Sequence, residues 1–134
     1  MGDFVSKFFN VAVLIGLCVV GYFFLTTPSP PIEPPSDQWF QTTVVDQAAP
    51  VLVKFGAPWC GPCRMLDPEL DKLEKSGQVN VVRIEIADHP ELARHYGVTS
   101  IPRLLLFEHG NVRADRVGYA NSEQLQSWIA NSIN

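Results

Sequence analysis

Two cysteines, Cys60 and Cys63, are separated by only two residues in the stretch A-P-W-C-G-P-C-R. Cysteines at this spacing can form a structural disulfide, contribute half of a metal site, or react as a dithiol. A disulfide here closes so small a loop that it would constrain little of the unfolded chain. A zinc site needs four ligands, and His89, His95 and His109 stand singly, without a second pair at ligand spacing. The pattern therefore favours a redox-active disulfide that needs no metal and no separate cofactor.

The pair follows an apolar run, V-L-V-K-F, that predicts a buried strand, and it opens a segment with helical periodicity. Unpaired N–H groups and the macrodipole at a helix N-terminus favour a thiolate, so Cys60 is expected to be exposed and reactive. Cys63, one turn further in, is expected to be more buried and to wait as a thiol. Gly61 would let the backbone pack tightly and expose the sulfur, and Pro62 fits an early helical position that needs no N–H. Cys60 would attack a substrate disulfide, and Cys63 would resolve the mixed disulfide.

Periodicity along the chain predicts the elements that must position this pair. They are a helix capped by Ser36-Asp37, a strand over 51–55, a helix over 60–76, a strand over 79–86, a helix over 90–96, strands over 103–107 and 112–117, and a last helix capped by Ser122. The helix over 60–76 is expected to bury one face, formed by Met65, Leu66, Leu70 and Leu73. This order predicts an α/β domain with a mixed central sheet of about four strands and helices on both faces. The first strand pairs are expected to be parallel, and the last two strands an antiparallel hairpin.

The motifs resemble those of the thioredoxin family. A-P-W-C-G-P-C-R, the preceding P-V-L-V-x-F, and the later Y-G-V-T-S-I-P-R-L-L-L-F and V-G-Y occur in the family's order. The resemblance implies a thioredoxin fold, with Cys60 as the nucleophile, Cys63 as the resolving thiol and Trp59 on the docking surface. It also implies that Pro102 is a cis-proline facing the cysteines, and that Ile101 offers backbone hydrogen bonds to an extended substrate.

Some positions depart from the family pattern. Lys54 stands where thioredoxins usually carry a buried acid, and Gly56 where a second tryptophan usually follows. One interpretation of Lys54 is structural, an ion pair or snorkelling side chain, with Glu85 of the neighbouring strand as the expected partner. The other is functional support of the active site, by stabilising a thiolate or by accepting the Cys63 proton. The family's first strand would fall on residues 31–35, where prolines cannot donate ladder hydrogen bonds, so it is expected to be absent or a brief edge.

The N-terminal part of the chain has a different composition. Residues 8–25 carry no charge and would cover about 27 Å as a helix, close to the hydrocarbon thickness of a bilayer. A cleaved signal peptide is the alternative, although the small-x-small cleavage site is missing before Pro28. We expect residues 8–27 to form a transmembrane anchor. Lys7 on its flank indicates that residues 1–7 are cytoplasmic and the remainder lies outside.

Beyond the anchor, residues 28–36 form a proline-rich linker, which favours an extended and semi-rigid spacer. Residues 37–134 form the predicted thioredoxin domain. Nucleic acid is not an expected partner, because the net charge is −4 and no run of five basic residues occurs.

These features together predict a membrane-tethered thiol–disulfide oxidoreductase that acts on protein disulfides outside the cytoplasm. The C-G-P-C motif and the isoleucine before Pro102 resemble those of reductants, so we expect it to reduce disulfides in exported proteins. Such a reductase would be recharged by a membrane-embedded electron donor. Two alternatives stay open: a disulfide-forming oxidase, and a binding module that uses the thioredoxin groove without turnover.

Overall fold

The chain divides into two compact units, Met1–Pro31 and Ile32–Asn134. The computed structural model describes residues 13, 15–18, 22 and 35–133. Within these residues, no helix has both the length and the apolar character needed to cross a membrane. The predicted anchor over 8–27 and linker over 28–36 lie mostly outside the described residues and stay predictions, as does the expectation that a strand over 31–35 is absent or a brief edge.

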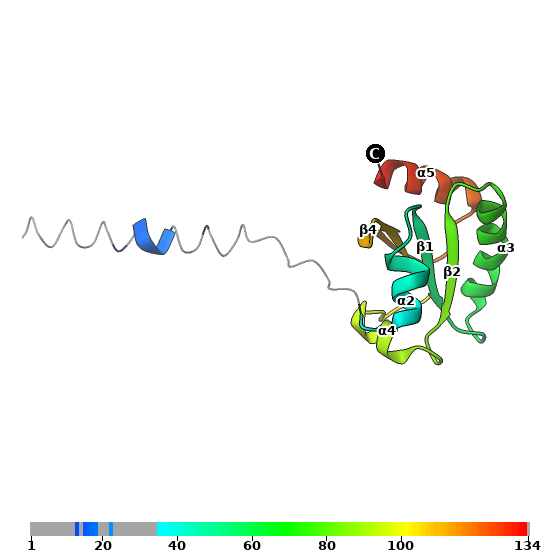
Figure 1. The fold of residues 1–134 in the computed structure, drawn as a ribbon, viewed down its shortest axis with the longest axis horizontal. Coiled ribbons are helices and arrows are strands. Elements are labelled where there is room, and N and C mark those ends of the chain that lie inside the picture. Colours follow the sequence, from blue (N-terminus) through cyan, green and yellow to red (C-terminus); the bar gives the residue numbers. More distant parts are fainter. Residues whose placement is uncertain (1–12, 14, 19–21, 23–34, 134) are drawn as a thin grey trace, which may run out of the picture. The chain divides into compact units, whose positions relative to one another are not determined.

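The second unit follows the predicted order of elements (Figure 1). In chain order these are α2 (Gln38–Phe40), the π-helical turn η1 (Gln41–Val45), β1 (Val51–Gly56), α3 (Gly61–Lys75), β2 (Asn80–Glu85), α4 (Pro90–His95), β3 (Arg103–Glu108), β4 (Asn111–Val117) and α5 (Ser122–Ser132). The predicted boundaries therefore lie within one or two residues of the observed ones for most elements.

The four strands form one sheet in the order β2-β1-β3-β4, so β1 is central and every residue of it is buried. β1 pairs with β2 in parallel and with β3 antiparallel, and β3 and β4 form the predicted antiparallel hairpin. The expectation of further parallel pairs is therefore wrong for β1 and β3. The reason is the length of α4: six residues span about 9 Å, whereas a six-residue strand is about 20 Å long. α4 cannot carry the chain back along the sheet, so β3 starts at the end where β2 finished.

Helices cover both faces of the sheet, as predicted (Figure 1). On one face, α2, η1 and α4 bury an aromatic core formed with the strands by Phe40, Val44, Val53, Phe55, Tyr96 and Phe107. On the other, α3 and α5 bury an aliphatic core formed with the strands by Leu52, Leu66, Leu70, Leu104, Leu106 and Leu125. Because β1 has a core on each side, its side chains are held firmly, including those that lie next to the cysteines.

Two helix details differ from the sequence expectations. The buried face of α3 begins at Cys63 and continues through Leu66 and Leu70, whereas Met65 is 61% exposed. The prediction for Met65 is wrong because Met65 lies one residue before the buried Leu66, about 100° around the helix, and so points away from the core. The cap of α5 is Asn121 rather than Ser122: the Asn121 side chain accepts a hydrogen bond from the Gln124 N–H, and the Gln124 side chain accepts one from the Asn121 N–H, a reciprocal capping box. The cap of α2 is Asp37, as predicted.

Candidate active site

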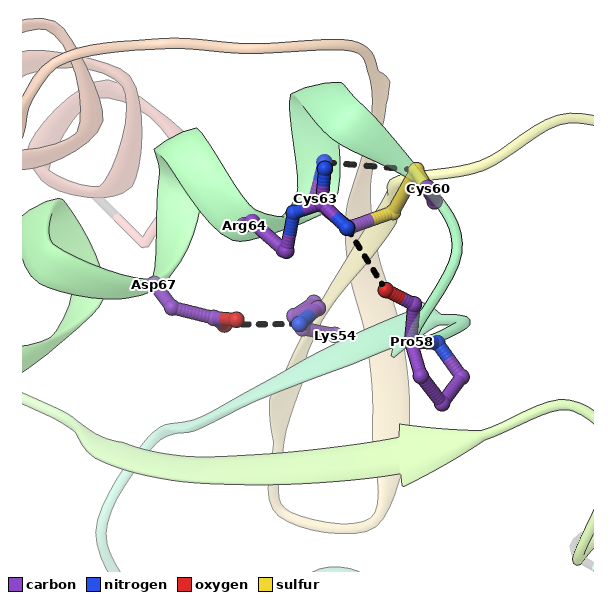
Figure 2. Close-up of a disulfide and its surroundings, with 6 residues drawn as sticks. All are labelled: Lys54, Pro58, Cys60, Cys63, Arg64 and Asp67. Carbon is purple, nitrogen blue, oxygen red and sulfur yellow. Dashed lines mark hydrogen bonds and ion pairs between the residues drawn. A yellow bond between two sulfur atoms is a disulfide. The ribbon is translucent and has the colours of Figure 1, made fainter.

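The two cysteines lie where β1 passes into α3, and they form a disulfide (Figure 2). Cys60 is the N-cap of α3 with an extended backbone, and its Sγ accepts a hydrogen bond of 3.2 Å from the Cys63 N–H. Pro62 occupies the first turn of the helix, where its missing N–H removes no helical hydrogen bond. The Sγ of Cys60 therefore lies against the unpaired N–H groups of the helix, which is the setting that stabilises a thiolate after reduction.

Both cysteines are buried, so the expectation that Cys60 is exposed is wrong, and only the predicted ranking of the two residues holds. Cys60 is 6% exposed and Cys63 is 1% exposed. Trp59 beside them is 73% exposed, so an apolar ring faces solvent next to the more accessible sulfur. A disulfide substrate can thus approach Cys60 more easily than Cys63.

The structure does not support the expected role of Gly61, which was to let the backbone pack tightly between the two cysteines. A Cβ built on Gly61 would meet nothing within 4 Å, so tight packing does not require a glycine there. A side chain of the helix stabilises the turn that precedes it: Arg64 Nη1 donates a hydrogen bond of 3.2 Å to the Pro58 carbonyl (Figure 2).

The loop before β3 brings a second segment to the disulfide. The Ile101–Pro102 peptide bond is cis, which confirms the predicted cis geometry of Pro102. Ile101 packs against the small cluster that contains both cysteines. The Pro102 carbonyl accepts a hydrogen bond of 2.9 Å from the Gly118 N–H. The predicted contacts of Trp59, Ile101 and Pro102 with a substrate stay predictions.

Lys54 of β1 is the buried charged residue beneath this surface, with 2% of it exposed. Its Nζ lies 2.6 Å from Oδ1 of Asp67 in α3 (Figure 2). The prediction that Glu85 is the partner of Lys54 is therefore wrong. In the β1–β2 register Glu85 lies opposite Gly56, and Arg83, a like charge, lies opposite Lys54.

Asp67 is the site residue that the sequence analysis missed. It follows Cys63 by four residues, so it lies about one turn further along the same side of α3. This spacing was available in the sequence, and it could have identified Asp67 as a side chain that faces the sheet below the cysteines.

Gly56 explains how the Lys54 side chain fits. A Cβ added to Gly56 would lie 2.7 Å from Lys54 Cε, 3.3 Å from Lys54 Nζ and 3.4 Å from Cys63 Sγ. The lysine stem fills the space that a side chain at position 56 would occupy, and its ammonium borders the same space as the Cys63 sulfur. The two departures from the family pattern, at positions 54 and 56, are thus one structural unit.

Comparison with known proteins agrees with this geometry. The thioredoxin family model matches residues 32–131. The chain is 38% identical to a thioredoxin of Rickettsia felis over 100 residues, covering 73% of this chain and 95% of that protein. It is 41% identical to a thioredoxin of Haemophilus influenzae over 100 residues, covering 73% and 94%. It is also 38% identical to the chloroplastic thioredoxin M4 of Arabidopsis thaliana over 96 residues, covering 70% of this chain and 50% of the relative.

Within the described residues, no group of three His, Cys, Asp or Glu side chains could hold a metal ion. A cysteine pair bonded across the first turn of α3, in a chain matched over most of its length by thioredoxins, identifies this protein as a member of the thioredoxin family and a thiol–disulfide oxidoreductase.

Proposed function

We propose that this chain is a membrane-tethered reductase of disulfides in exported proteins, with its catalytic domain on the extracytoplasmic side. The observation that carries the catalytic part is the position of Cys60, the more accessible sulfur, at the N-cap of α3. Cys60 attacks the substrate disulfide, and Cys63, held one turn away, resolves the mixed disulfide.

Three residues around Cys60 form the proposed substrate-binding surface. Trp59 offers an exposed apolar ring, and Ile101 packs against the cluster that contains the disulfide, with cis-Pro102 following it. An extended peptide lying across this loop would place its own disulfide next to Cys60, with the backbone of Ile101 as its hydrogen-bonding partner.

The tether rests on the sequence of the N-terminal part. Residues 8–27 are mostly apolar, carry no charge and are long enough for a bilayer, and Lys7 is the basic residue that precedes them. The proline-rich residues 28–36 would hold the catalytic domain away from the lipid surface. In this location a reductase depends on an electron donor embedded in the membrane, because each turnover leaves the Cys60–Cys63 pair oxidised.

A disulfide-forming oxidase is the second candidate, and the buried Lys54 favours it. An ammonium group beside Cys63 stabilises the thiolate and hence the reduced form, which makes the pair more oxidising than a standard thioredoxin at about −270 mV. A measured reduction potential near that value supports the reductase. A potential raised by 100 mV or so, and returned towards it by Lys54→Gln, supports the oxidase.

Trapping in intact cells tests the proposal directly. With Cys63→Ala, mixed disulfides on Cys60 persist, and we expect exported proteins to be recovered through them. The matched control carries both Cys60→Ser and Cys63→Ala and should recover none, and Cys18→Ser in both chains removes the third thiol. Recovery of cytoplasmic proteins instead would refute the proposed location. Full biological activity of a Cys60→Ser, Cys63→Ser chain would favour the non-catalytic binding module.

A further inference from the structure

We propose that Lys54 and Asp67 form a proton relay that deprotonates Cys63 when it resolves the mixed disulfide. This inference rests on the proposed function, because it concerns one step of the thiol–disulfide exchange at that site. It assigns Lys54 and Asp67 as positioning and proton-transfer residues, in a chain whose β1 lacks the usual buried acid.

The first support is the position of the ammonium group. Lys54 Nζ and Cys63 Sγ both border the small space beside Gly56, at 3.3 and 3.4 Å from the point where a Cβ would lie. Both residues are almost fully buried, so bulk water cannot readily collect a proton from the Cys63 thiol. The Lys54 ammonium is a polar group that borders the same space as that sulfur.

The second support is the exposure of Asp67. The Lys54 side chain is 3% exposed, whereas that of Asp67 is 38% exposed, and the two are joined by a contact of 2.6 Å. One end of the pair thus borders the same small space as the buried sulfur, and the other end is partly exposed to solvent. A structural ion pair needs no such connection, but a proton relay does.

The third support is the charge around Asp67. Arg83 of β2 lies on the same side of the sheet, with its Nε 3.8 Å from Asp67 Oδ1. Its other guanidinium nitrogens bind Asp71 and Glu74 of α3. Arg83 therefore holds the Asp67 carboxylate between two cations, within reach of the Lys54 ammonium.

Among the other neighbours of the Lys54–Asp67 pair, one carboxylate could also accept the proton. β3 contributes Leu104 opposite Lys54, which carries no charge. β2 contributes Glu85 opposite Gly56, and its Oε2 is buried without a hydrogen-bond partner in the described part of the chain. Glu85 is thus the alternative carboxylate that the experiment must distinguish from Asp67.

The step balances as follows. In the mixed disulfide, Cys60 Sγ is bonded to a substrate sulfur and Cys63 is a thiol. The thiol proton moves to Lys54 Nζ while Nζ gives one of its protons to the Asp67 carboxylate, leaving a Cys63 thiolate, an ammonium and a carboxylic acid. Asp67 then releases the proton to water. The thiolate attacks Cys60 Sγ: the Cys60–Cys63 bond forms, the bond to the substrate breaks, and the substrate sulfur leaves as a thiolate. The cysteine pair has lost two electrons, and the substrate disulfide has gained them.

Single-turnover kinetics separate this step from the first attack. The reduced full-length chain, with Cys18→Ser to remove the third thiol, is mixed with one equivalent of 5,5′-dithiobis(2-nitrobenzoate). Attack by Cys60 releases one thionitrobenzoate, and resolution by Cys63 releases the second. The rate of the second release is measured by stopped flow from pH 5 to 9, in the parent chain and in Lys54→Met, Asp67→Asn and the double variant. Glu74→Gln is the matched control, because Glu74 binds Arg83 from the same helix but not Lys54.

We expect Asp67→Asn to slow the second release by about 100-fold or more at pH 6, the lower end of the range for general acid–base catalysis. The difference should shrink towards pH 9, where hydroxide replaces the relay. Lys54→Met should slow it similarly, and the double variant should be no slower than the slower single variant within about twofold, since both act on one path. Glu74→Gln should change the rate by less than about twofold.

The results that overturn the relay are equally specific. An Asp67→Asn pH profile that overlays the parent profile refutes it, as does a slowing produced by Glu85→Gln and not by Asp67→Asn. Failure of the parent chain to release the first thionitrobenzoate would refute the proposed function itself, so the two failures are distinguishable. Urea denaturation of each oxidised variant checks that a slow rate does not reflect unfolding.

Discussion

The substitution Gly56→Ala adds one methyl group at the point where β1, Lys54 and the disulfide meet. The new Cβ would lie 2.7 Å from Lys54 Cε, whereas two carbon atoms pack at about 3.5–4.0 Å. The neighbouring Cys63 Sγ, at 3.4 Å, is near ordinary contact distance. The lysine stem must therefore move by about 1 Å, while the disulfide can stay in place.

The magnitude follows from what that movement breaks. The Lys54–Asp67 contact is 2.6 Å long, and a shift of about 1 Å takes it beyond hydrogen-bond range. A hydrogen bond to a charged group contributes about 1.5–3 kcal/mol. Replacing glycine by alanine restricts the unfolded chain and returns about 0.4–1 kcal/mol. We therefore expect Gly56→Ala to lower the free energy of unfolding by about 1–2 kcal/mol.

A double-mutant cycle isolates the proposed cause. Urea denaturation of the oxidised full-length chain gives the free energy of unfolding for Gly56→Ala, Lys54→Val and the double variant. Valine fits a strand and has no atoms that reach position 56, so Gly56→Ala should be neutral or slightly stabilising in the Lys54→Val background. The expected coupling is about 1.5 kcal/mol or more. Additivity within about 0.5 kcal/mol would refute the idea that Gly56 exists to make room for the lysine.

Three further predictions concern the rest of the domain. The hydrogen bond from Lys72, and then that from the Ser122 N–H, hold the pKa of Glu69 below its ordinary value of 4.5. The stability this gives is fully present above pH 4.5 and is lost as the pH falls through the folded pKa, so Glu69→Gln should flatten the acid limb of a stability–pH curve measured by urea denaturation; an unchanged limb contradicts this. Burial raises the pKa of Tyr96 to about 12, so stability should fall as the pH rises from 10 towards 12, and a Tyr96→Phe chain should lack this phenolate step in an ultraviolet titration. Leu70→Ala, at a fully buried position of α3, should lower the free energy of unfolding by about 2–5 kcal/mol, whereas a loss below 1 kcal/mol would contradict the packing described for that face.

Local sequence signals identified most of the domain because they reflect short-range physics. The apolar run before Cys60 predicted the buried β1, and the helical periodicity after it predicted α3. The chemistry at the N-terminus of α3 needs only the order strand, cysteine pair, helix, all of it contained within a few neighbouring residues. The cis peptide at Pro102 was inferred from the family resemblance rather than from any local pattern, and the structure confirms it.

The sequence alone thus determined the reactive pair, the helix that activates it and the layered α/β class, because strand and helix periodicities and the spacing of two cysteines are properties of neighbouring residues. Tertiary structure decided the direction of β3, the exposure of Met65 on α3, and above all the partner of Lys54. A charge on a strand can pair with a residue on its own sheet or on the helix above it. Only the packing of α3 over β1, with Gly56 leaving room, selects Asp67 over Glu85.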